Sequence, residues 1–78
     1  NKGEILMKKV YRMEELDCAN CARKMEDAIR KIKGVESVTI NFFTQKMTLE
    51  AEDSRFEEII QEAQKVCRRV EPDCRILL

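Results

Sequence analysis

The sequence predicts one α+β domain, in which two helices cover one face of a four-stranded antiparallel sheet. A chain of 78 residues is too short to build more than one core. Hydrophobic residues make up 44% of it, which is enough for a packed interior. Segments with the apolar spacing of helices are separated by segments that alternate as strands do, in the order strand, helix, strand, strand, helix, strand.

The first half of the chain predicts a strand and then a helix. Residues 9–14 alternate between the two faces of a half-buried strand. We expect residues 1–8 to form a flexible tail, so that the folded domain spans residues 9–78. Apolar side chains recur at helical spacing over residues 19–33, and Gly34 directly behind them suits a left-handed helix C-cap.

The second half predicts a hairpin, a second helix and a short last strand. Residues 37–51 hold two alternating runs joined by a turn. Ser54 and Glu57 form a capping box that predicts the start of the second helix, and Pro72 requires that helix to end before it. Cys74 then lies on the covered face of the last strand. With right-handed crossovers, this order of elements selects the ferredoxin-like βαββαβ sandwich.

The composition argues against several classes of function. Fifteen acidic and fifteen basic residues give a net charge of zero, without the basic excess that binding to nucleic acid or an acidic membrane needs. No apolar run exceeds three residues, so we predict neither a membrane span nor a secretory segment in this stretch. Because nothing marks the chain as secreted, we expect it in the cytoplasm, and we expect a monomer. The chain has no histidine, nucleophile–base triad or phosphate-binding glycine loop, so we expect a binding domain rather than an enzyme.

The residues with the clearest chemical potential form the segment DCANC, residues 17–21. The chain has four cysteines, and we expect reduced thiols because long periodic segments with two glycines and one proline do not resemble a disulfide framework. Cys18 ends a loop and Cys21 lies in the first turn of a helix, where free N–H groups and the helix dipole favour thiolates. Two neighbouring thiolates repel each other unless a cation lies between them, so the spacing predicts a soft-metal site.

Two other interpretations of the Cys-x-x-Cys spacing stay open. The two cysteines could be buried structural residues, or they could form a redox dithiol. The segment lacks the Trp, Gly and Pro residues that surround this motif in thioredoxin-like modules, so metal binding is the favoured interpretation.

The motif and its surroundings resemble the heavy-metal-associated (HMA) domain. The similar stretches are residues 16–26, LDCANCARKME, and residues 33–38, KGVESV. They are most similar to the cytosolic N-terminal domains of the zinc/cadmium/lead branch of metal-translocating P-type ATPases. The resemblance implies that Cys18 and Cys21 are the metal-binding thiolates, and that Asp17 matches a carboxylate that can coordinate divalent ions.

The neighbouring acidic residues bear on the choice of metal. Zinc and cadmium prefer three or four ligands of mixed sulfur and oxygen, whereas Cu⁺ is satisfied by two thiolates. Asp17 therefore favours Zn²⁺ or Cd²⁺, with Pb²⁺ included and Cu⁺ as the alternative. Asp17 has a second interpretation as the helix N-cap or a partner of the helix dipole. Glu15 stands where the family usually has glycine, which either alters loop flexibility or adds a charge that favours divalent cations.

Other residues are expected at the same end of the sheet, because the first loop, the hairpin turn and the second helix–strand loop meet there. Phe42 or Phe43 could screen the sulfurs, although core packing is the simpler role for Phe42. Cys67 and Glu71 are candidates for a further ligand, and packing is the simpler role for Cys67. A mixed patch that could guide docking comprises Arg23, Lys24, Lys46, Arg68 and Arg69.

The resemblance implies a function in metal transport. The domain is expected to bind a heavy-metal ion at an open site and to transfer it, as part of a divalent-cation efflux ATPase. Its partner is then the transmembrane part of the transporter or another metal-transfer domain. A free-standing metallochaperone, including one for Cu⁺, is the first alternative, and a dithiol redox module is the second.

Overall fold

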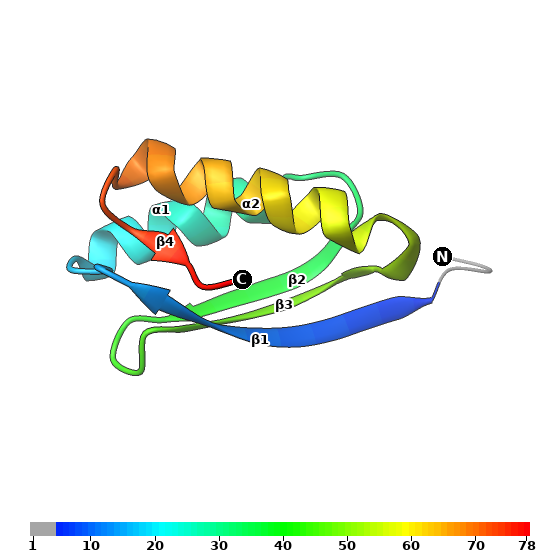
Figure 1. Ribbon diagram of the computed structural model, residues 1–78, viewed down its shortest axis with the longest axis horizontal. Coiled ribbons are helices and arrows are strands. Elements are labelled where there is room, and N and C mark those ends of the chain that lie inside the picture. The colour runs from blue at the N-terminus through cyan, green and yellow to red at the C-terminus, as the bar shows by residue number, and fades with distance from the viewer. Residues whose placement is uncertain (1–4) are drawn as a thin grey trace.

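The computed structural model describes residues 5–78 and confirms the predicted order of elements (Figure 1). The four strands form one antiparallel sheet in the order β2-β3-β1-β4. Both helices lie over the same face of that sheet, which is the ferredoxin-like arrangement. The elements are β1 (Leu6–Glu14), α1 (Ala19–Arg30), β2 (Val35–Asn41), β3 (Lys46–Glu52), α2 (Phe56–Val70) and β4 (Arg75–Ile76), with a 3₁₀ turn (Asp53–Arg55) before α2.

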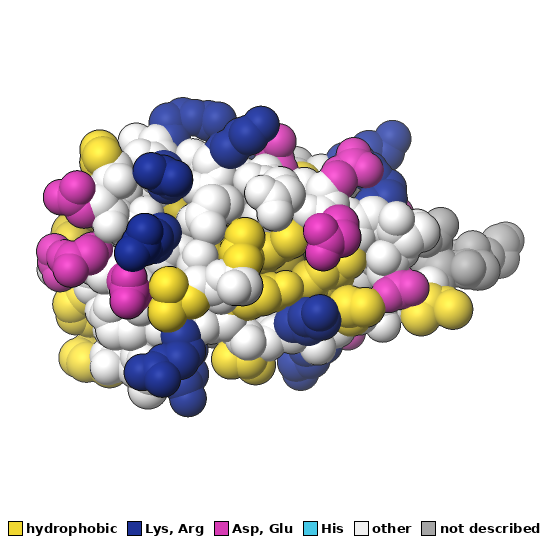
Figure 2. Space-filling view, viewed as in Figure 1, with side chains coloured by type: hydrophobic (Ala, Val, Ile, Leu, Met, Phe, Trp, Pro, Cys, Tyr) yellow, Lys and Arg dark blue, Asp and Glu magenta, His cyan; other side chains and the backbone are white. Residues whose placement is uncertain are grey.

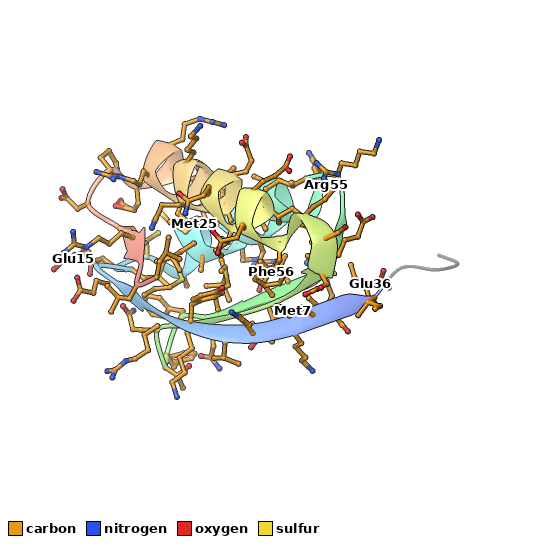
Figure 3. All side chains as sticks on the ribbon, turned by 45° about the vertical axis from the view of Figure 1, so that its right-hand side comes forward. Met7, Glu15, Met25, Glu36, Arg55 and Phe56 are labelled. Atoms are coloured by element: carbon orange, nitrogen blue, oxygen red, sulfur yellow. The ribbon has the colours of Figure 1, made fainter. Side chains whose placement is uncertain are left out.

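The core fills the layer between the sheet and the helices. The inward residues of the central strand β3, Met47, Leu49 and Ala51, are fully buried, because strand alternation sends every second side chain to the covered face. Met25 of α1 and Phe56 of α2 lie in the same layer (Figure 3). The apolar stripes of both helices are therefore the faces that bury against the sheet, as predicted.

Both helices are amphipathic and short. The outer face of α2 is charged, while Ile59, Ala63 and Val66 on its inner face are buried. Within residues 5–78, no helix has the length and apolar composition that crossing a membrane requires.

The link between α1 and β2 differs from its prediction. The helix α1 ends at Arg30 with Lys31 as its C-cap, so it is shorter than the predicted helix over residues 19–33. Gly34 lies beyond the cap with a φ of 98°, and a β-carbon there would lie 2.8 Å from Cδ1 of Ile59. The glycine is therefore required by its own backbone and by the close approach of α2 to this turn.

The predicted capping box at the start of the second helix is wrong. Ser54 belongs to the 3₁₀ turn, and α2 begins at Phe56 without a side-chain hydrogen bond from its N-cap, Arg55. The Arg55 guanidinium forms an ion pair with Glu58 at 3.2 Å. Acidic residues in the first turn, which the helix dipole favours, take the place of a hydroxyl cap.

The strand β1 is longer than predicted and keeps part of one edge open. It begins at Leu6, inside the predicted tail of residues 1–8, and β4 covers only its last two residues, Met13 and Glu14. Residues 1–4 of that predicted tail lie outside the described residues. Figure 2 shows hydrophobic side chains exposed on the face of the molecule between α2 and β1.

Candidate metal centre

The loop between β1 and α1 turns sharply and is anchored by one apolar side chain. Glu15 adopts a φ of 60°, the left-handed region in which a side chain is strained. Leu16, the next residue, is only 1% exposed and packs into the core. This conformation accounts for the glycine that the family resemblance leads one to expect at position 15. Asp17 follows with its side chain exposed to solvent.

The two cysteines of the motif lie together at the N-terminus of α1. Cys18 is the N-cap, and its Sγ accepts a hydrogen bond of 3.3 Å from the backbone N–H of Cys21. Its carbonyl accepts the first bond of the helix, 3.0 Å from Ala22 N. Both thiols are half-buried, so the interpretation as two fully buried structural cysteines is wrong. The N-cap interpretation of Asp17 is also wrong, because Cys18 occupies that position.

The protonation of the two thiols is unequal. A hydrogen bond from the Cys21 thiol, followed by one from the Cys21 backbone N–H, lowers the pKa of Cys18. The same bond to Cys18, together with desolvation and the charge of Cys18, raises the pKa of Cys21. Cys18 is therefore the thiol of the pair that ionises more readily. The positive end of the α1 dipole also favours the negative charge on the N-cap sulfur.

The acidic groups near the two cysteines do not complete a metal site in this conformation. The negative charge of Glu71, the C-cap of α2, raises the pKa of both Cys18 and Cys21, which places this carboxylate near the pair. In the part of the chain that the structure describes, no three Cys, Asp or Glu side chains are gathered closely enough to hold a metal ion. Neither Asp17 nor Glu71 therefore completes a three-ligand set in this conformation.

The other two cysteines belong to the core. Cys67 of α2 and Cys74, next to β4, are both fully buried. Burial, with a smaller contribution from the neighbouring Cys74, raises the pKa of the Cys67 thiol to about 12. Burial also raises the pKa of Cys74, to about 11. Both are therefore neutral thiols at physiological pH, which agrees with the packing role predicted for Cys74 and with the simpler of the two roles for Cys67.

The hairpin turn lies at the same end of the molecule as the cysteine loop (Figure 1). Phe42, predicted at the end of a strand, lies in this turn, and its ring packs half-buried against the core. Phe43 is 91% exposed and meets the Phe42 ring edge-on, with centroids 5.5 Å apart. Phe42 thus has the core role that was the simpler expectation, and Phe43 extends into solvent.

A residue that the sequence did not single out connects this turn to the cysteine loop. The side-chain amide of Gln45 donates to the carbonyl of Leu16 at 2.5 Å, and its oxygen accepts from the N–H of Leu16 at 3.3 Å. The contact joins residues 29 positions apart. Nothing in the pattern of a polar turn residue indicates such a contact, because it depends on how the hairpin packs against the loop.

The surface around the cysteine loop carries both signs of charge. Figure 2 shows acidic and basic side chains interspersed over this end of the molecule. Lys24 of α1 is close enough that its charge opposes the raised pKa of Cys21. Arg68 and Arg69 lie in the last turn of α2, which reaches the same end. The mixed patch expected from the sequence thus has its helical members near the loop.

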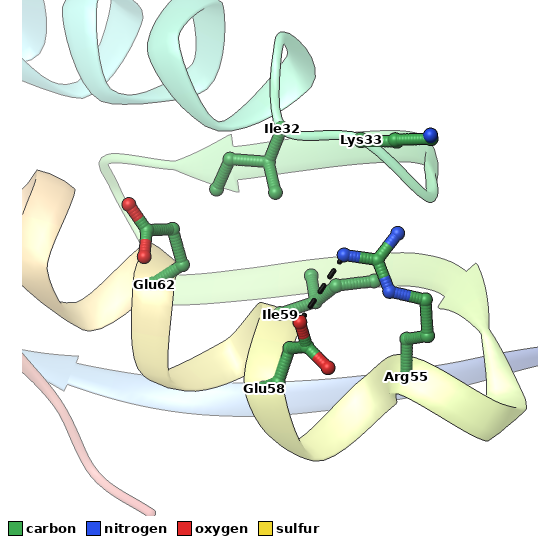
Figure 4. Close-up of a pocket in the computed structure, with 6 residues that line it drawn as sticks. All are labelled: Ile32, Lys33, Arg55, Glu58, Ile59 and Glu62. Atoms are coloured by element: carbon green, nitrogen blue, oxygen red, sulfur yellow. Dashed lines mark hydrogen bonds and ion pairs between the residues drawn. The ribbon is translucent and has the colours of Figure 1, made fainter.

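A pocket of about 290 Å³ lies between α2 and the turn that follows α1, at the end of the molecule away from the cysteine loop (Figure 4). The turn after α1 forms one wall and the start of α2 forms the other, with the Arg55–Glu58 ion pair on the α2 side. No cysteine lines it, so the thiol chemistry belongs to the opposite end. The lining residues are Ile32, Lys33, Arg55, Glu58, Ile59 and Glu62.

A two-layer domain with a half-exposed Cys-x-x-Cys at a helix N-terminus defines a class of small metal-binding modules. Residues 10–67 match the family described as "Heavy-metal-associated domain", and the chain belongs to that family. The family thus agrees with the resemblance seen in the motif and with the fold.

Two curated proteins are similar to this chain over most of its length. It is 31% identical over 67 residues to a cadmium, zinc and cobalt-transporting ATPase of Bacillus subtilis, covering 86% of this chain and 10% of the relative. It is 37% identical over 73 residues to a probable cadmium-transporting ATPase of Staphylococcus aureus, covering 83% of this chain and 9% of the relative. The chain therefore spans about a tenth of the length of these curated relatives.

A solved structure supports the fold independently. The N-terminal domain of a potential copper-translocating P-type ATPase from Bacillus subtilis, solved in its Cu(I)-loaded state, superposes with a TM-score of 0.73. The similarity covers 95% of this chain and 88% of that chain at 22% identity. At this level of identity the likeness establishes the shared architecture.

Proposed function

We propose that this domain binds a soft divalent metal ion through Cys18 and Cys21 and passes it to a partner. One observation carries the proposal: two half-exposed cysteines lie together at the N-terminus of α1, where the Cys18 sulfur accepts a hydrogen bond from the Cys21 N–H and its pKa is lowered. Thiolates in this setting bind soft and borderline cations. The role is capture and transfer, without catalysis by the domain itself.

An open ligand set suits transfer better than storage. Two sulfurs leave coordination positions of a zinc or cadmium ion free, whereas a complete cage of four protein ligands would close them. Ligands of a partner can then enter before Cys18 or Cys21 leaves. The half-exposed thiols are accessible to such an exchange, while the buried Cys67 and Cys74 take no part in it.

Asp17 is proposed as the third ligand for a divalent ion. Its carboxylate is exposed beside Cys18 and is free of the helix cap, so rotation of its side chain can bring oxygen to a metal held by the sulfurs. Zinc and cadmium accept such mixed coordination. The Bacillus subtilis relative is named for cadmium, zinc and cobalt transport, which is consistent with this choice.

Copper(I) transfer is the second candidate. The observation in its favour is that two sulfurs, with no third Cys, Asp or Glu group gathered on them in residues 5–78, match what Cu⁺ requires. In either case we propose that the domain serves a metal-translocating P-type ATPase as its cytosolic N-terminal part. The partner is then the transporter's transmembrane region or another metal-transfer domain, and a free-standing metallochaperone is the alternative.

Cadmium titration of the reduced, metal-free domain tests the thiol site. Thiolate-to-metal absorption should rise to one ion per domain and should be lost in Cys18→Ser and in Cys21→Ser. Cys67→Ala is the matched control, because it removes a thiol from the core and should keep the signal. A domain that takes up no cadmium, zinc, lead or Cu⁺ would overturn the proposal. An easily reduced Cys18–Cys21 disulfide without metal uptake would favour a redox module.

A second titration tests the divalent preference. Asp17→Asn removes the charge but keeps the size, and it should weaken zinc and cadmium binding by about tenfold or more while leaving Cu⁺ binding unchanged. Asp27→Asn is the control, since Asp27 is an exposed carboxylate of α1 that forms an ion pair with Arg30. Equal affinities of the Asp17 and Asp27 variants for zinc and cadmium would exclude the carboxylate ligand and favour the copper(I) role.

A further inference from the structure

The hairpin turn holds the cysteine loop through Gln45. Its side-chain amide donates to the carbonyls of Leu16, at 2.5 Å, and Phe42, at 3.2 Å. Its side-chain oxygen accepts from the Leu16 N–H at 3.3 Å, and its backbone carbonyl accepts from the Met13 N–H at 2.8 Å. Gln45 therefore contacts the chain on both sides of Glu15, where the backbone turns.

These contacts fix the loop immediately before the thiols. The carboxamide pairs with both backbone groups of Leu16, as a neighbouring strand would, and the Leu16 side chain is buried beneath. The chain beyond Leu16 has one residue, Asp17, before the N-cap Cys18. A loop fastened at this point has little freedom to move the Cys18 sulfur away from the N–H of Cys21.

The backbone of Gln45 indicates that the contact compensates for strain. Its φ is 58°, in the left-handed region where glycine or asparagine would be less strained. Asparagine tolerates that conformation, but its amide is one methylene shorter. The glutamine side chain spans from the turn to both backbone groups of Leu16.

We propose that Gln45 is a positioning residue for the metal centre. By fastening Leu16 it holds Cys18 at the N-cap with its sulfur on the Cys21 N–H, so that the two thiols are arranged before metal arrives. This inference rests on the proposed metal-binding function. Residues that orient metal ligands typically change affinity by about 10- to 100-fold when they are removed, and a tenfold loss is expected here.

The chain contains a matched control for this interaction. Gln64 of α2 makes the same two-point contact with Ile76 of β4, donating to its carbonyl and accepting from its N–H, each at 2.8 Å. Both glutamines are half-buried. Removing the Gln64 carboxamide thus deletes an equivalent pair of hydrogen bonds without touching the loop that carries Cys18.

The experiment measures cadmium affinity by competition with a chromophoric chelator in Gln45→Ala, Gln45→Gly and Gln64→Ala. Both Gln45 variants should bind cadmium about tenfold more weakly, and Gln64→Ala should stay within twofold of the unsubstituted domain. Gln45→Gly should melt at a higher temperature than Gln45→Ala, because glycine relieves the positive φ. If both Gln45 variants lose cadmium affinity equally although their melting temperatures differ, the loss comes from the missing carboxamide and Gln45 acts by positioning the thiols.

Hydrogen exchange of the Leu16 amide in the metal-free domain gives a readout that does not depend on metal. Its protection should be lost in both Gln45 variants and kept in Gln64→Ala. Unchanged cadmium affinity in Gln45→Ala, an equal loss of affinity in Gln64→Ala, or retained Leu16 protection would each overturn the positioning role. Absence of cadmium binding by the unsubstituted domain, with normal Leu16 protection, would instead identify a failure of the proposed function.

Discussion

Replacing Glu15 with glycine should stabilise the domain. Glu15 has a φ of 60°, and a side chain in that region costs roughly 1–2 kcal/mol. Glycine removes this strain but gives the unfolded chain about 0.5–1 kcal/mol of additional conformational freedom. The middle of each range gives a net gain in the free energy of unfolding of about 0.75 kcal/mol. For a domain of 78 residues this corresponds to a rise in Tm of roughly 3–6 °C.

A matched variant separates strain from charge at this position. Glu15→Gln removes the carboxylate but keeps the strained backbone, and because the side chain is exposed we expect a change within about 0.5 kcal/mol. Thermal and urea unfolding of the reduced domain, in the presence of a chelator, compares the three proteins. A lower Tm for Glu15→Gly, or an equal gain in Glu15→Gln, would refute the assignment of strain to the backbone of Glu15.

Three further predictions concern the core and its thiols. Gly34→Ala should destabilise the domain by about 2–4 kcal/mol in urea unfolding, and adding Ile59→Val should recover part of the loss by removing the methyl that lies 2.8 Å from the new β-carbon. Burial raises the Cys67 pKa from 9.0 to about 12, so the unfolded chain loses this proton first and stability should fall as pH rises from about 9 towards 12. In Cys67→Ala the free energy of unfolding should fall less steeply over this range, by about 1.4 kcal/mol per pH unit. An unchanged slope would contradict the raised pKa of Cys67. Leu16→Ala should cost about 3 kcal/mol in the same unfolding assay, since the side chain is 1% exposed, and a cost below 1 kcal/mol would show that the loop is not anchored there.

Local patterns of the sequence were sufficient to predict the fold and the position of the thiol pair. Helical spacing and strand alternation each show which side of an element faces the core, and both can be recognised from a few neighbouring residues. The same reasoning failed at the start of α2, where Ser54 and Glu57 fit the capping box but the 3₁₀ turn places Arg55 at the N-cap. Capping depends on backbone angles at single residues, which a pattern of residue types does not fix.

The sequence could not predict which groups change the pKa of the two thiols, because that depends on distances between elements far apart in the chain. Cys67 was a ligand candidate because α2 ends near the cysteine loop, yet its thiol faces the core and is fully buried. Glu71, from the loop after the same helix, is close enough for its charge to raise the pKa of both Cys18 and Cys21. The two residues are only four positions apart and would share a face of a continuous helix, but α2 ends at Val70 and the extended backbone of Glu71 takes its side chain away from the core.

The sequence by itself determined that this chain folds as a βαββαβ sandwich and brings two cysteines to a helix N-terminus, because periodicity and the Cys-x-x-Cys spacing act over a few residues. Only the tertiary structure decided that Cys18, rather than Asp17, caps the helix. It also decided that position 15 is left-handed and that Gln45 fastens the loop from 29 residues away. The Gln45 contact joins the hairpin to the loop, and no local pattern specifies a contact between such distant segments.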